Sequence, residues 1–284
     1  MRIVSVGDNC LDWYLDRQMI YPGGNTLNLA VYMRRLGAEA AYIGQLGDDR
    51  PGDIMAAALA AEDVDITHLR RLPGRSGYAT IKTIEGERVF QGASPGVTPF
   101  VLDQADYAFL AGSDLIHTGD SSYQDDAVAR LAAIAPVSFD FSVKPIQFCE
   151  PILPAVTYAI FSRPSFTLAE VADLIAWAHG LGVAEVYVTQ GEDGSFSSAG
   201  DGIHHEPAIP TEAVDTLGAG DSFITGVLFA RLSGMSIPEA ARNGSALAAA
   251  TCCGYGAFGR GEPAGDMTIA PDHQLDPEHP HPTE

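Results

Sequence analysis

Residues 215–223 read Asp-Thr-Leu-Gly-Ala-Gly-Asp-Ser-Phe, a combination of residue types that suits both anion binding and proton transfer. Gly218, Ala219 and Gly220 have almost no side chain and an apolar run follows them, which predicts a glycine-rich turn leading into a helix. Backbone N–H groups at the start of such a helix attract negative charge. The carboxylate of Asp221 does not help to bind an anion. It can instead accept the proton of an attacking hydroxyl while the amides stabilise a transferring phosphoryl group.

A simpler interpretation is that Asp221 only caps the helix, because aspartate is a favoured N-cap residue. A single short glycine-rich motif does not distinguish the two roles. The decision depends on whether the rest of the chain brings residues suited to the same chemistry to this turn.

Two carboxylates follow the first predicted strand. Residues 3–7 form a short apolar run that is typical of a buried parallel strand, and Asp8 and Asp12 lie in the polar loop after it. Open α/β sheets bind ligands at the carboxyl ends of their strands, and carboxylates suit the hydroxyl groups of a sugar. For Asp8 taken alone, an ordinary acidic turn is an equal alternative.

A pair of glycines and a pair of asparagines come next. Gly23 and Gly24 precede a predicted helix that ends at Gly37, where glycine is a favoured stop. The glycine pair allows a ligand to approach the backbone closely. Asn25 and Asn28 lie one turn apart on one face, and one of them is expected to cap the helix. Together these residues indicate a site for a polyol.

The elements that must position these residues alternate between buried strands and helices, as in an α/β domain. Strands are predicted at 41–47, 114–119, 137–141, 158–161 and 185–189, and helices at 53–62, 168–181, 222–234 and 238–253. Residues 195–198 and 202–205 predict an antiparallel hairpin after a second glycine-bearing turn. A second strand pair at 78–90, around Glu85-Gly86-Glu87, predicts a small lid over the strand ends. Arg88 in this hairpin is either a substrate ligand or a solvated edge charge.

The composition narrows the classes of protein and partner. The chain has 284 residues, of which 46% are hydrophobic, and no run of about 18 apolar residues, so a globular protein is expected. The formal net charge of −21 argues against nucleic acid and anionic membrane as partners, because no basic patch is available to neutralise phosphates. The four cysteines fit neither a zinc pattern nor a disulfide framework, and no signal peptide is seen at the start, which predicts a cytoplasmic location. Residues 263–284, rich in Pro, His, Asp and Glu, are predicted to be a disordered tail.

Both glycine-containing motifs resemble those of one family. The Asp-Thr-x-Gly-Ala-Gly-Asp stretch at 215–221 resembles a signature of the ribokinase-like (PfkB) carbohydrate kinases, and Gly-Gly-Asn-x-x-Asn-x-Ala at 23–30 resembles their amino-terminal signature. The resemblance runs from Ile3 to about Gly259. It implies a three-layer α/β/α domain over residues 1–262, with a mostly parallel central sheet. It also implies a small β-sheet lid formed by segments at about 12–22 and 76–98.

The resemblance also implies a role for each candidate residue. Asp221 is the implied catalytic base, with an anion hole from Gly218, Ala219 and Gly220. The implied substrate ligands are Asp8, Asp12, Gly23, Gly24, Asn25, Asn28 and Arg88. The implied nucleotide-binding residues are Lys144, Thr189, Gly191, Gly194 and Asn243. The implied cofactors are ATP and Mg²⁺, and a requirement for a monovalent cation is left open.

Two segments depart from the family pattern. After the strand ending at Phe161, the family has Asn-x-x-Glu, which serves the hydrated Mg²⁺ and the phosphates, whereas this chain has Ser-Arg-Pro-Ser at 162–165. The common Asp-Pro-Asn-x-Arg is altered to Asp-Phe-Ser-Val-Lys at 140–144, so Lys144 offers a point charge without the fork of an arginine. ATP itself carries Mg²⁺, but how the protein anchors the metal is left open.

Within the family, the chain is similar to the branch that phosphorylates fructoselysine. The similar segments are 7–12, 88–90, 106–108 and 140–142, together with the missing Asn-x-x-Glu. The expected activity is ATP-dependent phosphorylation of a primary hydroxyl on a ketose-type substrate, with fructoselysine 6-phosphate as the product. The expected partners are a sugar or sugar-amine and a nucleotide, and exposed lid strands predict a homodimer.

Other functions stay open at this point. One alternative is a kinase for fructose, 2-keto-3-deoxygluconate, ribose or a nucleoside. A second is a non-catalytic sensor of sugar or nucleotide, which the missing Asn-x-x-Glu favours and an intact Asp221 disfavours. A dinucleotide-dependent oxidoreductase is disfavoured because the first turn lacks Gly-x-Gly-x-x-Gly.

Overall fold

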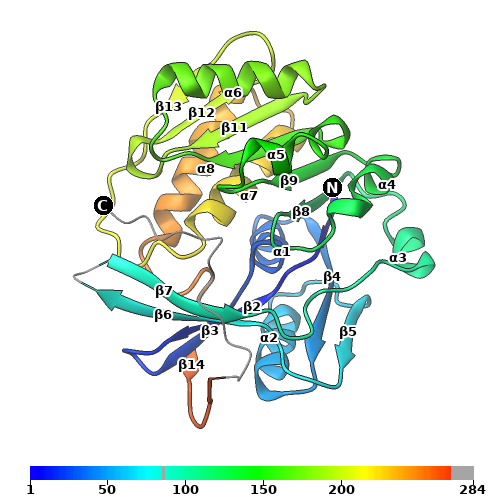
Figure 1. Cartoon of the computed structure of the whole chain (residues 1–284), viewed down its shortest axis with the longest axis vertical. Coiled ribbons are helices and arrows are strands. Elements are labelled where there is room, and N and C mark those ends of the chain that lie inside the picture. The colour runs from blue at the N-terminus through cyan, green and yellow to red at the C-terminus, as the bar shows by residue number, and fades with distance from the viewer. Residues whose placement is uncertain (85–86, 270–284) are drawn as a thin grey trace.

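A computed structural model of the chain describes residues 1–84 and 87–269, and shows a large sheet between helices with a smaller sheet beside it (Figure 1). The large sheet has nine strands in the order β13, β12, β11, β10, β9, β8, β1, β4 and β5. In this order the strands span His204–Glu206, Ser195–Ser198, Glu185–Thr189, Tyr158–Ser162, Val137–Asp140, Leu115–Gly119, Arg2–Val6, Glu39–Gly47 and Leu69–Leu72. Neighbouring strands are parallel except where β12 pairs with β11 and with β13. The predicted mostly parallel central sheet is therefore confirmed.

Helices cover both faces of this sheet, which makes the architecture three-layered. The helices α1, α7 and α8 span Asn25–Arg35, Ala219–Leu232 and Ile237–Thr251, and α1 and α7 pack against each other. These three helices share a buried apolar cluster with one face of the strands. The opposite face packs against α3, α4 and α6, which span Gln104–Phe109, Val128–Ala132 and Leu168–Gly180. The remaining helices are α2 (Arg50–Ala61) and the short α5 (Ile146–Cys149), with single 3₁₀ turns at Asp125–Ala127, Leu153–Ala155 and Gly191–Asp193.

The smaller sheet has five strands in the order β14, β3, β2, β6 and β7. They span Glu262–Pro263, Met19–Gly23, Cys10–Tyr14, Tyr78–Ile84 and Glu87–Ser94. The strands β6 and β7 form the predicted hairpin, with a bulge between Thr80 and Ile81. The five strands are the small β-sheet that the sequence predicted beside the main domain.

Two details of this sheet differ from the expectation. The polar segment after β1 was predicted to be a loop, but Cys10 to Tyr14 form β2, whose two ladders with β3 and β6 satisfy its backbone. The tail was predicted to begin too early in the sequence, because Pro263 lies in β14, pairs with Met19 and so belongs to the fold. Ala264 is fully buried, and Arg50 donates hydrogen bonds to the carbonyls of Pro263 and Ala264. Residues 270–284 of the predicted tail lie outside the described part of the chain.

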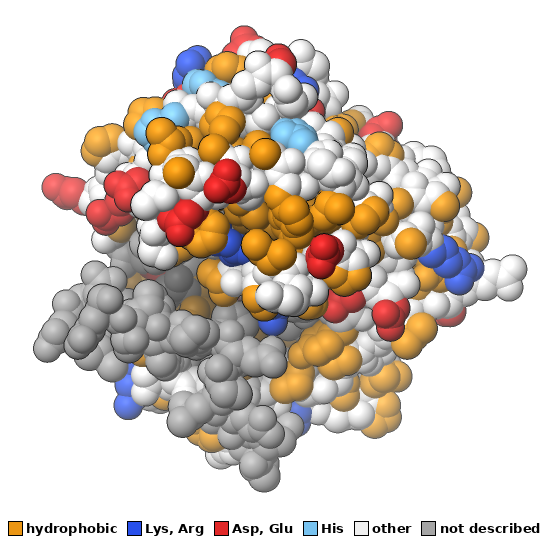
Figure 2. Space-filling view, turned by 45° about the horizontal axis from the view of Figure 1, so that its top comes forward, with side chains coloured by type: hydrophobic (Ala, Val, Ile, Leu, Met, Phe, Trp, Pro, Cys, Tyr) orange, Lys and Arg blue, Asp and Glu red, His pale blue; other side chains and the backbone are white. Residues whose placement is uncertain are grey.

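The surface agrees with the acidic composition. On the face shown in Figure 2, Lys and Arg side chains are scattered among acidic, apolar and uncharged ones and form no continuous basic patch. Within the described ranges, no helix combines the length and the apolar character that crossing a membrane requires.

Candidate active site

The amino terminus of α7 has the geometry of an anion-binding turn. Gly218 is the N-cap residue, with a left-handed φ of 76°, and a Cβ at this position would lie 2.4 Å from the Cβ of Ala257. Only glycine therefore fits this position without a shift of the neighbouring backbone. Gly220 is exposed, and a Cβ added there would meet no atom within 4 Å. The first turn of the helix consequently leaves backbone N–H groups without intrahelical partners beside open space.

Asp221 is not the cap of this helix. Gly218 occupies the N-cap position, and Asp221 is the third residue of α7. The helix start has no side-chain cap hydrogen bond. The alternative interpretation from the sequence, in which Asp221 only caps the helix, is therefore wrong.

The carboxylate of Asp221 meets the two asparagines of the amino-terminal motif. The Nδ2 of Asn25 donates to its Oδ1 at 2.8 Å, and the Nδ2 of Asn28 donates to its Oδ2 at 2.6 Å. Asn25 and Asp221 are 196 positions apart in sequence, and the packing of α1 against α7 brings them together. Asn28 is almost fully buried, and its Oδ1 has no hydrogen-bond partner.

Neither asparagine caps α1, in contrast to the prediction. Asp8 lies across the helix start, where its Oδ2 accepts from the N–H of Asn25 at 2.7 Å and its Oδ1 from the N–H of Thr26 at 3.2 Å. The hydroxyls of Thr26 and Ser122 donate to the same Oδ1 at 3.0 and 2.9 Å. The buried carboxylate of Asp8 thus anchors α1 from outside the helix, and leaves the Asn25 and Asn28 side chains available for Asp221.

Several acidic groups converge near Asn25. Its Nδ2 also donates to the Oδ2 of Asp140, at 3.1 Å. Burial raises the pKa of the Asp140 carboxyl well above its ordinary value, and the negative charges of Asp120, Asp221 and Asp8 raise it further.

The inner face of the small sheet adds a further carboxylate. Asp12, in β2, is 5% exposed, and a Cβ on Gly23 would lie only 2.2 Å from its Oδ2. Any side chain at position 23 would therefore collide with the Asp12 carboxylate, which explains the glycine. Burial raises the pKa of the Cys10 thiol, and the charges of Asp12 and Asp8 add to this, so both carboxylates act on one region.

Two predicted substrate ligands of this region remain. Gly24 separates β3 from α1 with a φ of 108°, and a Cβ there would lie 2.6 Å from the Cα of Asn9. Arg88 pairs with Thr83 in the ladder between β6 and β7. The side chain of Arg88 lies outside the described part of the structure.

The predicted nucleotide turn follows β11. Thr189 ends this strand, and Gly191 and Gly194 have φ angles of 59° and 94°. A Cβ on Gly191 would meet nothing within 4 Å, whereas a Cβ on Gly194 would lie 2.2 Å from the carbonyl oxygen of Glu206. Gly194 is therefore required by the packing of the hairpin, while Gly191 leaves the turn open to a ligand. Asn243 lies on the exposed side of α8, where its Nδ2 donates to the carbonyl of Glu239 at 2.9 Å.

A buried arginine organises the turn that carries Lys144. Arg163, in the Ser-Arg-Pro-Ser segment at 162–165, is 8% exposed and donates to the carbonyl oxygens of Ser142 and Lys144, each at 2.6 Å. Ser142 has a φ of 46°, which the Arg163 contact helps to hold. The Nζ of Lys144 lies 5.6 Å from the ring centroid of Phe148. Sequence reasoning assigned no role to Arg163, although a charged residue directly after a buried strand was a signal.

A second residue that sequence reasoning missed is His117, in β8. It is fully buried, and its Nε2 lies 2.9 Å from the Oδ1 of Asn25. Burial lowers the pKa of His117 to about 3, so the ring is neutral. A histidine inside an otherwise apolar strand was the available signal.

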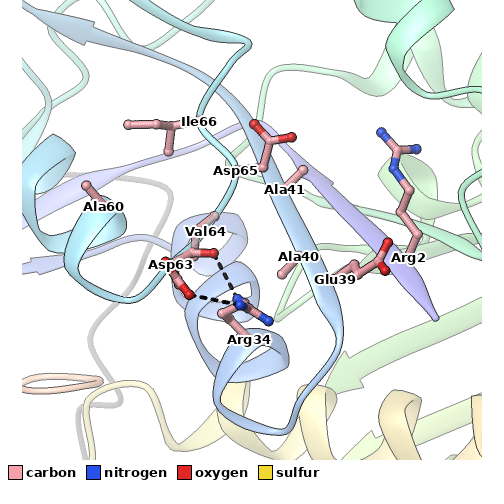
Figure 3. Close-up of a pocket in the computed structure, with 10 residues that line it drawn as sticks. All are labelled: Arg2, Arg34, Glu39, Ala40, Ala41, Ala60, Asp63, Val64, Asp65 and Ile66. Atoms are coloured by element: carbon pink, nitrogen blue, oxygen red, sulfur yellow. Dashed lines mark hydrogen bonds and ion pairs between the residues drawn. The ribbon is translucent and has the colours of Figure 1, made fainter.

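A separate recess of about 490 Å³ lies at the opposite edge of the large sheet (Figure 3). Its lining includes Arg2, Arg34, Glu39 and Asp63. Arg34 points toward Asp63 and forms an ion pair with it at 3.0 Å. The recess contains none of the predicted site residues, and its arginines are already engaged.

Comparisons with known proteins identify relatives over nine tenths of the chain. The sequence model described as pfkB family carbohydrate kinase matches residues 8–262. The fructosamine kinase FrlD of Bacillus subtilis is 39% identical over 269 residues, which cover 93% of this chain and 95% of that protein. The fructoselysine 6-kinase of Escherichia coli is 35% identical over 261 residues, covering 90% and 99%. The ribokinase of Arabidopsis thaliana, solved with ribose and ATP, is 20% identical and superposes with a TM-score of 0.78, covering 90% of this chain and 94% of that one. This last similarity confirms the ribokinase-like fold.

Proposed function

The chain belongs to the pfkB family of carbohydrate kinases, and we propose that it phosphorylates a primary hydroxyl of a fructosamine, with fructoselysine as the substrate. The protein is a sugar kinase, an enzyme that transfers a phosphoryl group to an alcohol. The proposed substrate is supported by the names of two relatives at 39% and 35% identity, one a fructosamine kinase and one a fructoselysine 6-kinase.

The observation that carries the proposed mechanism is the meeting of Asp221 with Asn25 and Asn28 at the start of α7. We assign Asp221 as the base that takes the proton of the substrate hydroxyl. The hydroxyl oxygen forms a bond to the terminal phosphorus of ATP, the bond between that phosphorus and the bridging oxygen breaks, and ADP leaves. We propose that the backbone amide of Gly220 stabilises the charge on the transferring group, beside Gly218 and Ala219 of the same turn. The N–H of Ala219 donates to the carbonyl of Thr216 at 3.2 Å, so it must leave this partner to join in.

The proposed substrate carries an amine, and the charge around Cys10 suits it. Asp8 and Asp12 are two buried carboxylates beside the small sheet, and after burial itself their charges raise the pKa of the neighbouring Cys10 thiol, so this region favours positive charge. A cationic amino group is attracted to such a region, whereas a neutral sugar such as fructose gains nothing from it. We propose that Asp12, rather than the fully engaged Asp8, contacts the substrate, together with Asn28 and Gly24. Gly23 and Arg88 stay in the proposed set of substrate ligands.

The proposed nucleotide ligands are Lys144, Thr189, Gly191, Gly194 and Asn243. The open backbone at Gly191 supports the turn as a place for ATP, and the half-buried Lys144 supplies positive charge. Among the described residues, no group of three or more His, Cys, Asp or Glu side chains is arranged to hold a metal ion. This fits Mg²⁺, which takes most of its ligands from phosphates and water and so enters with ATP. Mg²⁺ bound in this way neutralises phosphate charge.

Two further expectations concern ions and assembly. A fructokinase from Vibrio cholerae with the same fold, at 22% identity, was solved with fructose, ADP and a calcium ion, and a mutant of it with potassium. A monovalent-cation requirement is a proposal for this chain on that ground, and measuring turnover with and without K⁺ tests it. We also propose a homodimer through the small sheet, because the edge strands of a sheet carry unpaired backbone groups that can pair with a second chain.

The decisive test replaces Asp221 by asparagine, which keeps the size of the side chain and removes its basicity. Turnover of ATP and fructoselysine is expected to fall by about 10³-fold or more, with sugar binding retained. Near-normal turnover would remove Asp221 from the mechanism. A panel with fructoselysine, other fructosamines, fructose, 2-keto-3-deoxygluconate, ribose and nucleosides, followed by ADP release, tests the substrate. A kcat/KM for fructose equal to that for fructoselysine would refute the proposed specificity.

A further inference from the structure

His117 occupies a position where a titratable side chain is costly. It lies in β8, between β1 and β9, and is fully buried. In the parallel ladders it pairs with Ser5 on β1 and with Ser138 on β9, so these three side chains form a polar row on one face of the sheet. A buried polar group is destabilising unless it is hydrogen bonded, so the contacts of His117 indicate what it is for.

Both ring nitrogens have partners, and the partners fix the tautomer. Nδ1 lies 2.6 Å from the Oγ of Ser138, and Nε2 lies 2.9 Å from the Oδ1 of Asn25. An amide oxygen only accepts hydrogen bonds, so Nε2 carries the proton and Nδ1 accepts from the Ser138 hydroxyl.

The surroundings of Asn25 select the same arrangement. Its Nδ2 faces the carboxylates of Asp140 and Asp221, at 3.1 and 2.8 Å. A flipped amide would turn its oxygen toward the Asp221 carboxylate, which only accepts hydrogen bonds. The contact with Asp221 therefore fixes the NH₂ group on that side and the amide oxygen on the side of His117. A Cβ on Gly119 would lie 3.0 Å from the Asn25 Oδ1, so this amide also lies close over the end of β8.

We propose that His117 is a positioning residue for phosphoryl transfer, because its Nε2–H holds the Asn25 amide with the NH₂ group directed at Asp221. This inference rests on the proposed role of Asp221 as the base. His117 itself does not exchange a proton with the substrate. The pathway runs from the Ser138 hydroxyl through the His117 ring and the Asn25 amide to Oδ1 of Asp221.

A pair of substitutions separates the reach of the side chain from its polarity. The amide of glutamine extends to about the position of the histidine Nε2, whereas that of asparagine extends only to about the position of Nδ1. His117→Gln is therefore expected to keep the contact with Asn25, with a kcat within about 3-fold of the unmodified enzyme. His117→Asn is expected to lose the contact and to lower kcat by about 10- to 100-fold, since a misplaced reacting group has an effect of that size. Equal kcat values for the two variants, both measured as folded proteins, would overturn the proposal.

A double-mutant cycle tests whether His117 acts through Asn25. In the Asn25→Ala background the two His117 variants are expected to have the same kcat within about 2-fold, because the amide that they orient is gone. A full 10-fold or greater difference between them in that background would refute the pathway. Ser5→Ala, in the same polar row, is the matched control and is expected to leave kcat unchanged.

Two further measurements cover the remaining outcomes. If His117→Asn does not fold, Ser138→Ala removes the hydroxyl that sets the tautomer, and a kcat at the level of the unmodified enzyme would then refute the proposal. Asp221→Asn is measured in parallel. If Asp221→Asn is inactive while His117→Asn is normal, only this inference fails, whereas an active Asp221→Asn means that the proposed function of the site fails.

Discussion

Replacing Gly220 by alanine should change stability and activity in opposite directions. Gly220 is the second residue of α7, its backbone φ is not positive, and an added Cβ would meet no protein atom within 4 Å. Alanine loses less conformational entropy than glycine on folding into a helix, so the free energy of unfolding should rise by about 0.5–1 kcal/mol. For a chain of this size, the melting temperature should rise by about 1–3 °C.

The same open space is where we expect the transferring phosphoryl group. A methyl group there keeps the phosphate from the amides of the first turn, and loss of one such donor typically lowers turnover about 100-fold, or about 3 kcal/mol. The matched control is Gly180→Ala at the end of α6, which is also exposed and also meets no atom within 4 Å. It should give a similar rise in melting temperature with unchanged kcat.

Thermal melts and a coupled assay of ADP release measure both effects on the same preparations. A Gly220→Ala enzyme with normal kcat/KM would show that the anion does not approach this backbone. A lower melting temperature for Gly220→Ala would show that the space above the helix start is not open.

Two further predictions concern stability. His117 has a pKa of about 3 in the fold and an ordinary value near 6.5 when unfolded, so the unfolded chain binds the extra proton between these values. The contribution of this group to stability is present above about pH 6.5 and falls as the pH is lowered toward 3, by up to about 5 kcal/mol. Denaturant titrations at several pH values should therefore show that the free energy of unfolding of His117→Gln depends less on pH than that of the unmodified protein. Arg163→Met should lower the free energy of unfolding by about 1–3 kcal/mol, because the Lys144 carbonyl loses its guanidinium donor and the Ser142 carbonyl keeps only the N–H of Ser162. An unchanged denaturation midpoint for Arg163→Met would contradict the structural role of its guanidinium.

The fold followed from the sequence because its strongest signals are local. Short apolar runs ending in polar loops mark the parallel strands, and glycines such as Gly37 and Gly182 mark helix ends, both with left-handed φ angles. The strand β2 escaped this reasoning because the buried carboxylate of Asp12 interrupts the apolar pattern that identifies a strand.

The site was predictable only in part. The motifs at 23–28 and 215–221 were identified, and the structure joins them through Asn25, Asn28 and Asp221. The cap of α1 was not predictable, because it comes from Asp8, 17 positions before Asn25. Local propensity does not register a partner that reaches a helix start from another strand end. The same limit applies to His117, whose contact with Asn25 spans 92 positions.

The junction between the two sheets has a mechanical consequence. Gly23 is the last residue of β3, Asn25 is the first residue of α1, and only Gly24 separates them. The other connection is also short, since only Gly7, Asp8 and Asn9 join the end of β1 to the start of β2. Any tilt of the five-stranded sheet would therefore be passed directly to Asn25, and so to its hydrogen bond with Asp221.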